Sequence, residues 1–167
     1  MMRVAAALLS MTLLTGCGMV SQITGGAKIQ VNSDAMEPTI ERGTTVTAQP
    51  LKDGRPPKPG DIVAFKAPEW ADGVFVYRVI GVPGNRVDCC DGQGRVVVDG
   101  KPLDEPYLQG MSPSSTSMFS VTVPPDRLWV LGDNRAAAAD SRTRQDRPGG
   151  GTIAVSSVIG VVERPAG

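Results

Sequence analysis

The sequence predicts an all-β protein whose short strands form a barrel or a folded, coiled sheet. Glycine (20) and proline (14) make up about a fifth of the 167 residues, which favours many strands joined by turns over a helical bundle. Short runs rich in valine, isoleucine or phenylalanine alternate with glycine, proline and aspartate. Two hairpin signals, residues 92–94 and Asp99-Gly100, separate such runs. The length allows one domain with a sizeable core.

The N-terminal segment is typical of a bacterial lipoprotein signal. Arg3 precedes the apolar stretch 4–14, and small residues then lead to Cys17, where that signal requires a cysteine for lipid transfer and cleavage. The prediction is a signal peptide over 1–16, lipidation of Cys17, a membrane-proximal tether over 17–28 and a β domain over 29–167. The alternative is an uncleaved anchor, because residues 4–27 carry no charge. Either way, the body lies at the extracytoplasmic face of the cell membrane.

The expected strands follow one another through the rest of the chain. They are residues 28–32, 44–48, 61–66, 74–81, 96–98, 120–123, 128–131 and 153–162. Residues 51–59 contain three prolines and several charges and are predicted to be a solvated loop. Residues 111–117 and the three glycines 149–151 are expected to be further connections. The one short helix is expected within 136–140, because alanine is the strongest helix former.

Composition excludes several classes of function. Formal charge is zero, from 17 basic and 17 acidic residues, so nucleic acid is not an expected partner. No histidine is present, which removes every Ser-His-Asp and Cys-His mechanism. With only three cysteines, no metal site and no cofactor are expected. Cys89 and Cys90 are neighbours at about 3.8 Å between Cα atoms, which is short for a disulfide. Two alternatives therefore stay open for these cysteines: a strained disulfide ring or two free thiols.

Five blocks occur in one order along the chain. They are residues 33–40, with Ser33, Ala35, Met36 and Pro38; 60–65; 77–85, which begins Tyr77-Arg78; 99–108; and 132–142, with Gly132-Asp133-Asn134-Arg135 and Asp140-Ser141-Arg142. This series closely resembles type I signal peptidases, the membrane-bound Ser/Lys endopeptidases that remove signal peptides. The resemblance implies a β-rich core of coiled, connected sheets, with a shallow groove that accepts an extended peptide as an added strand.

The residues that should carry the chemistry are replaced. The resemblance puts the serine nucleophile at Ala35, the general-base lysine at Tyr77 and the serine that supports the lysine at Ala138. It puts an oxyanion-binding serine at Ser33 and groove residues at Met36 and Pro38. Structural positions around the site fall on Arg78, Gly132, Asp133, Asn134, Arg135, Asp140, Ser141 and Arg142.

Plainer roles for the same residues stay open. Ser33 can be a turn residue, Met36 a core residue and Tyr77 a packing residue, and Asp133 with Arg142 is expected to form a structural ion pair. Ser33 as a displaced nucleophile is disfavoured, because same-face residues two apart in a strand are about 6–7 Å apart.

The functional hypothesis is a lipid-anchored, catalytically inactive relative of signal peptidase I that keeps an extended-peptide groove. Its expected partners are the membrane through Cys17 and signal peptides, preproteins or an active signal peptidase. The alternative is an active membrane-associated serine endopeptidase that processes signal peptides with non-standard residues. A third hypothesis is a surface lipoprotein that keeps only the scaffold.

Overall fold

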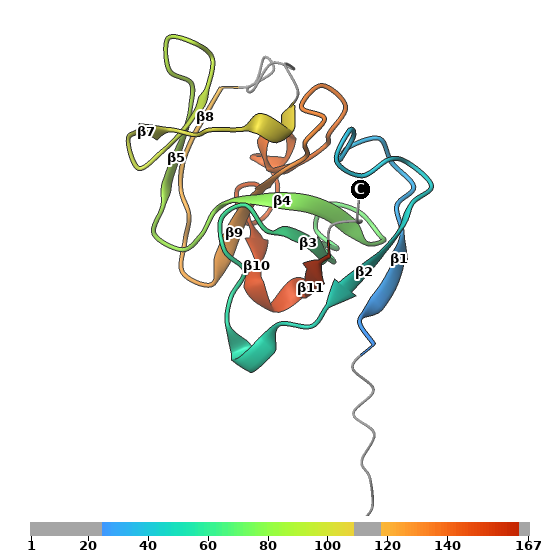
Figure 1. Cartoon of the computed structure of the whole chain (residues 1–167). Helices are drawn as coiled ribbons and strands as arrows, with labels where there is room; N and C mark the ends of the chain where they lie inside the picture. The colour runs from blue at the N-terminus through green and yellow to red at the C-terminus, as the bar shows by residue number, and fades with distance from the viewer. Residues whose placement is uncertain (1–24, 109–117, 164–167) are drawn as a thin grey trace, which may run out of the picture.

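The computed structural model describes residues 25–108 and 118–163, and eleven short strands form the framework of this part of the chain (Figure 1). The strands are β1 (Ala27–Gln30), β2 (Thr45–Gln49), β3 (Ile62–Phe65), β4 (Phe75–Gly81), β5 (Arg86–Cys89), β6 (Val96–Val98), β7 (Lys101–Pro102), β8 (Phe119–Thr122), β9 (Arg127–Leu131), β10 (Ile153–Ala154) and β11 (Val158–Val162). Four short 3₁₀ turns, η1 (Lys52–Gly54), η2 (Pro106–Leu108), η3 (Ser141–Arg144) and η4 (Val155–Ser157), complete the regular structure.

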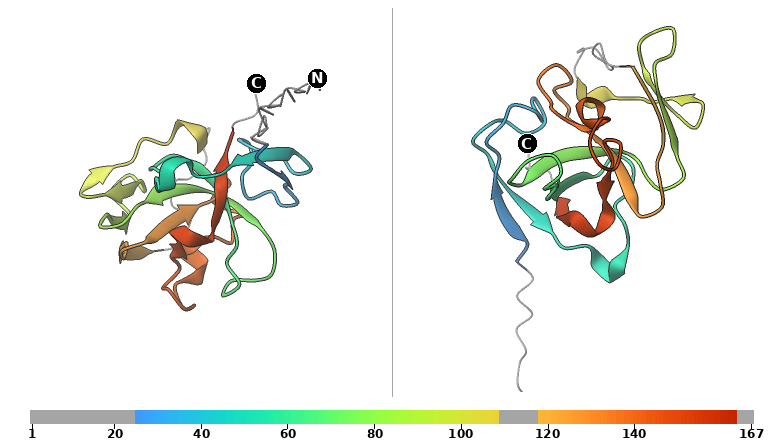
Figure 2. Two further views of the ribbon diagram at one scale, coloured as in Figure 1. Left: turned by 90° about the horizontal axis from the view of Figure 1, so that it is seen from below. Right: turned by 180° about the vertical axis from the view of Figure 1, so that it is seen from behind.

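Seven strands form one curled antiparallel sheet in the order β1-β2-β11-β3-β4-β9-β10. β11 closes the curl, because it pairs with β2 through its last residues and with β3 along its length. The register shifts between Val158 and Gly160 and between Val79 and Gly81, and such bulges bend a sheet. The curled sheet, seen from two further sides in Figure 2, confirms the predicted all-β, coiled-sheet fold.

A second sheet, in the order β7-β6-β5-β8, stands beside one end of the first (Figure 1). Both predicted hairpin turns are present in it. Asp99 and Gly100 have φ values of 50° and 78°, the paired positive angles that a tight two-residue turn between β6 and β7 requires. The turn at 92–94 joins β5 to β6.

Two apolar clusters hold the sheets. The larger lies inside the curl and contains four neighbouring rings, Phe65, Trp70, Phe75 and Tyr77, with centroids 5.6–6.4 Å apart. The smaller lies where the second sheet meets β9 and centres on Trp129, which is fully buried. β3 is buried at all four positions, which matches its uninterrupted apolar sequence.

Most predicted strands are present with small shifts of their ends, and two predictions are wrong. The run 153–162 is not one strand, because η4 separates β10 from β11. The alanines at 136–139 form no helix: the Asn134 carbonyl accepts from the N–H groups of Ala137 and Ala138, and the single turn ends there. The Arg135 carbonyl accepts a hydrogen bond from the Arg142 side chain and not from a following helical N–H group. Side-chain contacts therefore outweigh the helix propensity of alanine. Cys17, the expected signal peptide and residues 111–117 lie outside the described residues.

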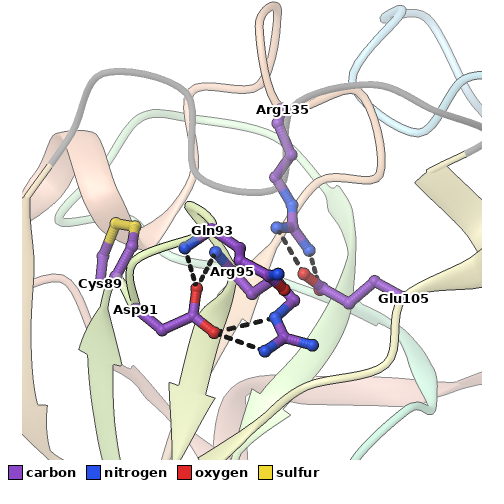
Figure 3. Close-up of a disulfide and its surroundings, with 7 residues drawn as sticks. Cys89, Asp91, Gln93, Arg95, Glu105 and Arg135 are labelled. Carbon is purple, nitrogen blue, oxygen red and sulfur yellow. Dashed lines mark hydrogen bonds and ion pairs between the residues drawn. A yellow bond between two sulfur atoms is a disulfide. The ribbon is translucent and has the colours of Figure 1, made fainter.

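The two adjacent cysteines form a disulfide (Figure 3). The peptide bond between Cys89 and Cys90 is cis, and their Cα atoms are 3.0 Å apart. The Cα spacing assumed from the sequence, which is that of a trans peptide bond, is therefore not the one in the structure. The turn that follows is fixed by the Asp91 carboxylate, which accepts from the backbone of Gln93 and Arg95 at 2.9 Å each. The disulfide therefore sits at a rigid hairpin turn.

Gly160 is expected to be required for closing the sheet. A Cβ atom there would overlap the backbone of Gln49 and Ala48 on β2. Gly160→Ala should lower the free energy of unfolding by about 1–3 kcal/mol, measured by urea denaturation. The matched control is Gly92→Ala, where the same atom meets nothing within 4 Å, so its effect should stay within about 0.5 kcal/mol. Equal effects of the two substitutions would contradict this account.

Candidate functional site

Two of the three replaced positions meet at Gly132, on the loop after β9. Gly132 is buried, and a Cβ atom on it would overlap both the Ala35 carbonyl and the Ala138 Cβ. The N–H of Asn134 donates a 3.0 Å hydrogen bond to the same Ala35 carbonyl, which ties the 33–40 segment to this loop. Ala35 and Ala138 are both buried. The fold therefore brings residues about a hundred positions apart in sequence to one place.

Tyr77, the third replaced position, reaches the same loop from β4. Its hydroxyl donates to the carbonyl of Ala139 at 3.2 Å, and its ring packs in the aromatic cluster. Burial, followed by the negative charge of Asp140, raises the pKa of Tyr77 to about 12. At neutral pH the residue is therefore a protonated phenol that donates a hydrogen bond. It cannot serve as a base in the way a neutral amine does.

The Asp133 carboxylate joins the three chain segments that carry these positions. It accepts from Arg78 Nε at 2.8 Å and from Arg78 Nη2 at 2.5 Å, and it accepts a short hydrogen bond from the hydroxyl of Thr39. Both side chains of the ion pair are buried, at 4% and 0% exposure. Arg78 also donates to the Gly60 carbonyl at 2.9 Å. Each charge is thus met by directed partners, which a buried ion pair requires.

A second buried pair orders the far side of the loop. Asp140 accepts from Gly132 N at 3.0 Å and from Arg142 through Nε and Nη2, both at 2.8 Å. The Ser141 hydroxyl accepts from the N–H of Val130 at 3.0 Å. The expected pair of Asp133 with Arg142 is therefore wrong. Asp133 faces β4, and Arg142 folds back two residues along the chain onto Asp140.

A third pair was not expected from the sequence. Arg135 forms a buried ion pair with Glu105 (Figure 3) and donates to the Gly132 carbonyl at 3.0 Å. The Tyr107 hydroxyl donates to Glu105 at 2.6 Å, and the Tyr107 ring lies 3.9 Å from the Arg78 guanidinium. Glu105 and Tyr107 belong to the 99–108 block, and their membership of a matching block was the signal that could have assigned them to the site.

A groove of about 220 Å³ runs past Ser33 and Tyr77. Its lining is Gln30, Val31, Asn32, Ser33, Val74, Phe75, Val76 and Tyr77. One wall is the end of the edge strand β1, and the other is the start of β4. Within the described residues, β9 pairs with β4 only from Arg78 onward, so no strand lies beside Phe75–Tyr77 on that edge.

Of the residues expected to form the groove, Ser33 lines it and is exposed. Met36 and Pro38 are not among its lining residues: Met36 is fully buried in the core, and Pro38 is exposed on the following turn. Apart from Ser33 and Tyr77, the lining residues were not assigned to the site from the sequence.

The groove contains no serine–lysine pair. All five lysines of the sequence are described and exposed, and none lines the groove. In the described part of the chain, no three metal-ligating side chains gather to hold an ion. Among the described lining residues, Ser33 and Tyr77 carry the hydroxyl groups, and none of these residues is a lysine or an arginine.

The curled, mainly β sheet matches the fold of signal peptidase I. A family model described as signal peptidase, peptidase S26, matches residues 1–166. The chain belongs to this signal peptidase family.

Individual relatives agree. Signal peptidase I of Mycobacterium tuberculosis (strain H37Rv) is 32% identical over 180 residues, covering 78% of this chain and 61% of the relative. Signal peptidase I of Bacillus caldolyticus is 33% identical over 146 residues, covering 80% and 75%. A crystal structure of a signal peptidase I from Enterococcus faecalis V583 matches 65% of this chain and 98% of its own, with a TM-score of 0.52 and 31% identity. The chain spans about three fifths of the mycobacterial relative.

Removing the Asp133 carboxylate should strongly destabilise the protein. Asp133→Ala leaves the Arg78 charge buried without its partner, so the free energy of unfolding should fall by about 3–5 kcal/mol. The control is Asp34→Ala, which breaks the Arg42–Asp34 pair, whose side chains are 63% and 48% exposed; its cost should be about 0–1 kcal/mol. Urea denaturation compares the two variants, and similar losses would refute the assigned role of Asp133.

Stability should fall at alkaline pH through Tyr77. Its pKa is raised from 10.0 to about 12, so the folded state favours the neutral phenol. That contribution is complete below pH 10 and is lost as pH rises through about 12. It amounts to at most about 3 kcal/mol. Urea denaturation between these pH values should show a shallower fall for Tyr77→Phe than for the parent. Burial also raises the pKa of Tyr107. Because Tyr107 is present in both the parent and Tyr77→Phe, its contribution cancels in the comparison. Parallel pH profiles would contradict the assignment.

Proposed function

We propose that this chain is a catalytically inactive member of the signal peptidase family that binds extended peptides in the groove and does not cut them. The observation that carries the proposal is selective replacement. Ala35, Ala138 and Tyr77 occupy the positions where the family resemblance expects the nucleophile, the supporting serine and the lysine. The surrounding pairs, Arg78–Asp133 and Arg142–Asp140, are formed and buried.

The loss of catalysis follows from the chemistry of those side chains. A methyl group at Ala35 has no oxygen to attack a carbonyl, and a phenol with a pKa of about 12 does not deprotonate a hydroxyl near neutral pH. In serine proteases, loss of nucleophile and base lowers turnover about a million-fold. A processing enzyme does not function at such a rate.

Peptide binding is supported by the two walls of the groove. Main-chain groups at the edges of β1 and β4 can pair with an extended ligand, and alternate side chains can enter pockets between them. By resemblance, signal peptides with small residues near the cleavage site are the expected ligands. We also propose that Cys17 is lipidated and holds the body at the extracytoplasmic membrane face. Among the described residues, no helix is long and apolar enough to cross a bilayer.

Binding without cleavage is the direct test. A fluorescent peptide containing a signal-peptide cleavage region should bind the full chain, as measured by anisotropy, and should remain uncut by mass spectrometry. Ser33→Trp fills the groove and should abolish binding. Ser156→Trp, at an exposed serine on η4, is the matched control and should bind normally. Cleavage by the parent, lost in Ser33→Ala, would overturn the inactive assignment. Absence of binding would overturn the proposed peptide groove and favour the hypothesis that the protein keeps only the scaffold of the family.

Restoring the two missing groups separates chemistry from groove shape. Ala35→Ser combined with Tyr77→Lys should create measurable cleavage of the same peptide, because the buried pairs around the site already hold the loop. Ala35→Ser alone should create none, since the hydroxyl still has no base. Equal activity of the single and double variants would refute the assigned role of position 77.

A further inference from the structure

A second hollow, separate from the groove, lies beneath the loop between β2 and β3. Its volume is about 300 Å³. Prolines and aliphatic side chains form much of the lining, and Lys52, Arg55 and Lys58 stand around it. The lining is Gln49, Pro50, Leu51, Lys52, Arg55, Pro56, Pro57, Lys58, Asp61 and Val161. An apolar hollow with cationic groups at its rim suits a ligand that carries both a negative charge and an apolar part.

The loop is held in a defined shape by backbone contacts. The N–H of Arg55 donates to the Lys52 carbonyl at 3.0 Å, which closes η1. The N–H of Lys58 donates to the Asp61 carboxylate at 2.8 Å, and Asp61 returns a bond to the Lys58 carbonyl at 3.1 Å. Pro57 is buried between these two turns. Lys52 and Lys58 are therefore presented, exposed, on a fixed frame.

This hollow lies at the end of the molecule where the described chain begins. Ala27 of β1 pairs with Ala48 of β2, and the loop starts two residues later at Pro50. Figure 1 shows η1 and the first residues of β1 at the same end of the curled sheet. Residues 4–27 carry no charge, and Lys28 is the first charged residue after them. Its ammonium donates to the Thr47 hydroxyl at 2.8 Å, beside the loop.

Most of the lysines lie at this end of the molecule. Three of the five lysines, Lys28, Lys52 and Lys58, lie here together with Arg55. Two acidic residues occur in the loop segment, Asp53 and Asp61, and the Asp61 carboxylate is bonded to the backbone. Lys66, at the opposite end of β3, and Lys101, in the second sheet, are the remaining two.

We propose that the loop hollow binds the phosphate headgroups of anionic phospholipids in the membrane that the N-terminal segment enters. Lys52, Arg55 and Lys58 contact the phosphate, and the prolines and Leu51 lie against the glycerol and upper acyl region. Each cation near an anionic membrane surface strengthens association about fivefold. The contact fixes the orientation of the body on the bilayer. This inference rests on the proposed membrane attachment and is independent of peptide binding in the groove.

The test is lysine footprinting of the full chain on vesicles. Chain bound to phosphatidylcholine vesicles, with or without phosphatidylglycerol, is labelled briefly with an acetylating reagent and each lysine is quantified by mass spectrometry. Phosphatidylglycerol should slow labelling of Lys52 and Lys58 about fivefold. Lys66 and Lys101 should label at unchanged rates and serve as internal controls. Equal protection of all four, or protection on neutral vesicles as well, would overturn the proposal.

A pair of matched variants supplies the second readout. Amide hydrogen exchange of residues 50–59 should slow on phosphatidylglycerol in the parent and in Lys66→Gln/Lys101→Gln, but not in Lys52→Gln/Lys58→Gln. Retention of the effect in the latter variant would refute the site. Protection by soluble glycerol phosphate without vesicles would assign the hollow to a soluble anion instead. A chain that does not float with vesicles at all overturns both the attachment and this surface, whereas flotation without protection overturns only the surface.

Discussion

The buried Asp133 carboxylate is the constraint on which the site geometry depends. It lies on the loop after β9, accepts from Thr39 in the segment that contains Ala35, and accepts from Arg78, the neighbour of Tyr77. Three stretches that are distant in sequence are thus held by one charged group that is closed off from water. Because an unpaired buried charge is costly, the arrangement is all-or-none. The site keeps its shape for a structural reason that does not require catalysis.

The replacements at the site are compatible with this frame. Tyr77 joins the rings of Phe65, Trp70 and Phe75, and its hydroxyl finds a carbonyl acceptor at Ala139. The burial that would lower the pKa of a lysine raises that of a phenol, so both residues are kept neutral by the same surroundings. A tyrosine at this position is therefore compatible with a well-packed strand.

Much of the fold was predictable from the sequence, because turn residues and the short blocks shared with signal peptidases are each recognisable in a few consecutive residues. Asp99-Gly100 requires positive φ at both positions, and the structure has a hairpin there. The partners of charged residues were harder to predict: Asp133 pairs across the sheet with Arg78, and no sequence spacing indicates that choice. The alanines before Asp140 form no helix, because tertiary hydrogen bonds outweigh propensity. The groove lies between the end of β1 and the start of β4, and the proximity of segments so far apart in sequence leaves no local signal.

The incomplete pairing of β4 also bears on how the protein behaves in concentrated solution. Within the described residues, no strand pairs with Phe75–Tyr77 on the side away from β3, and β1 ends the same sheet as an outer strand. Strand edges of this kind are templates for pairing with an extended polypeptide. High protein concentration would therefore favour edge pairing between copies, and a peptide bound along the edge would oppose it.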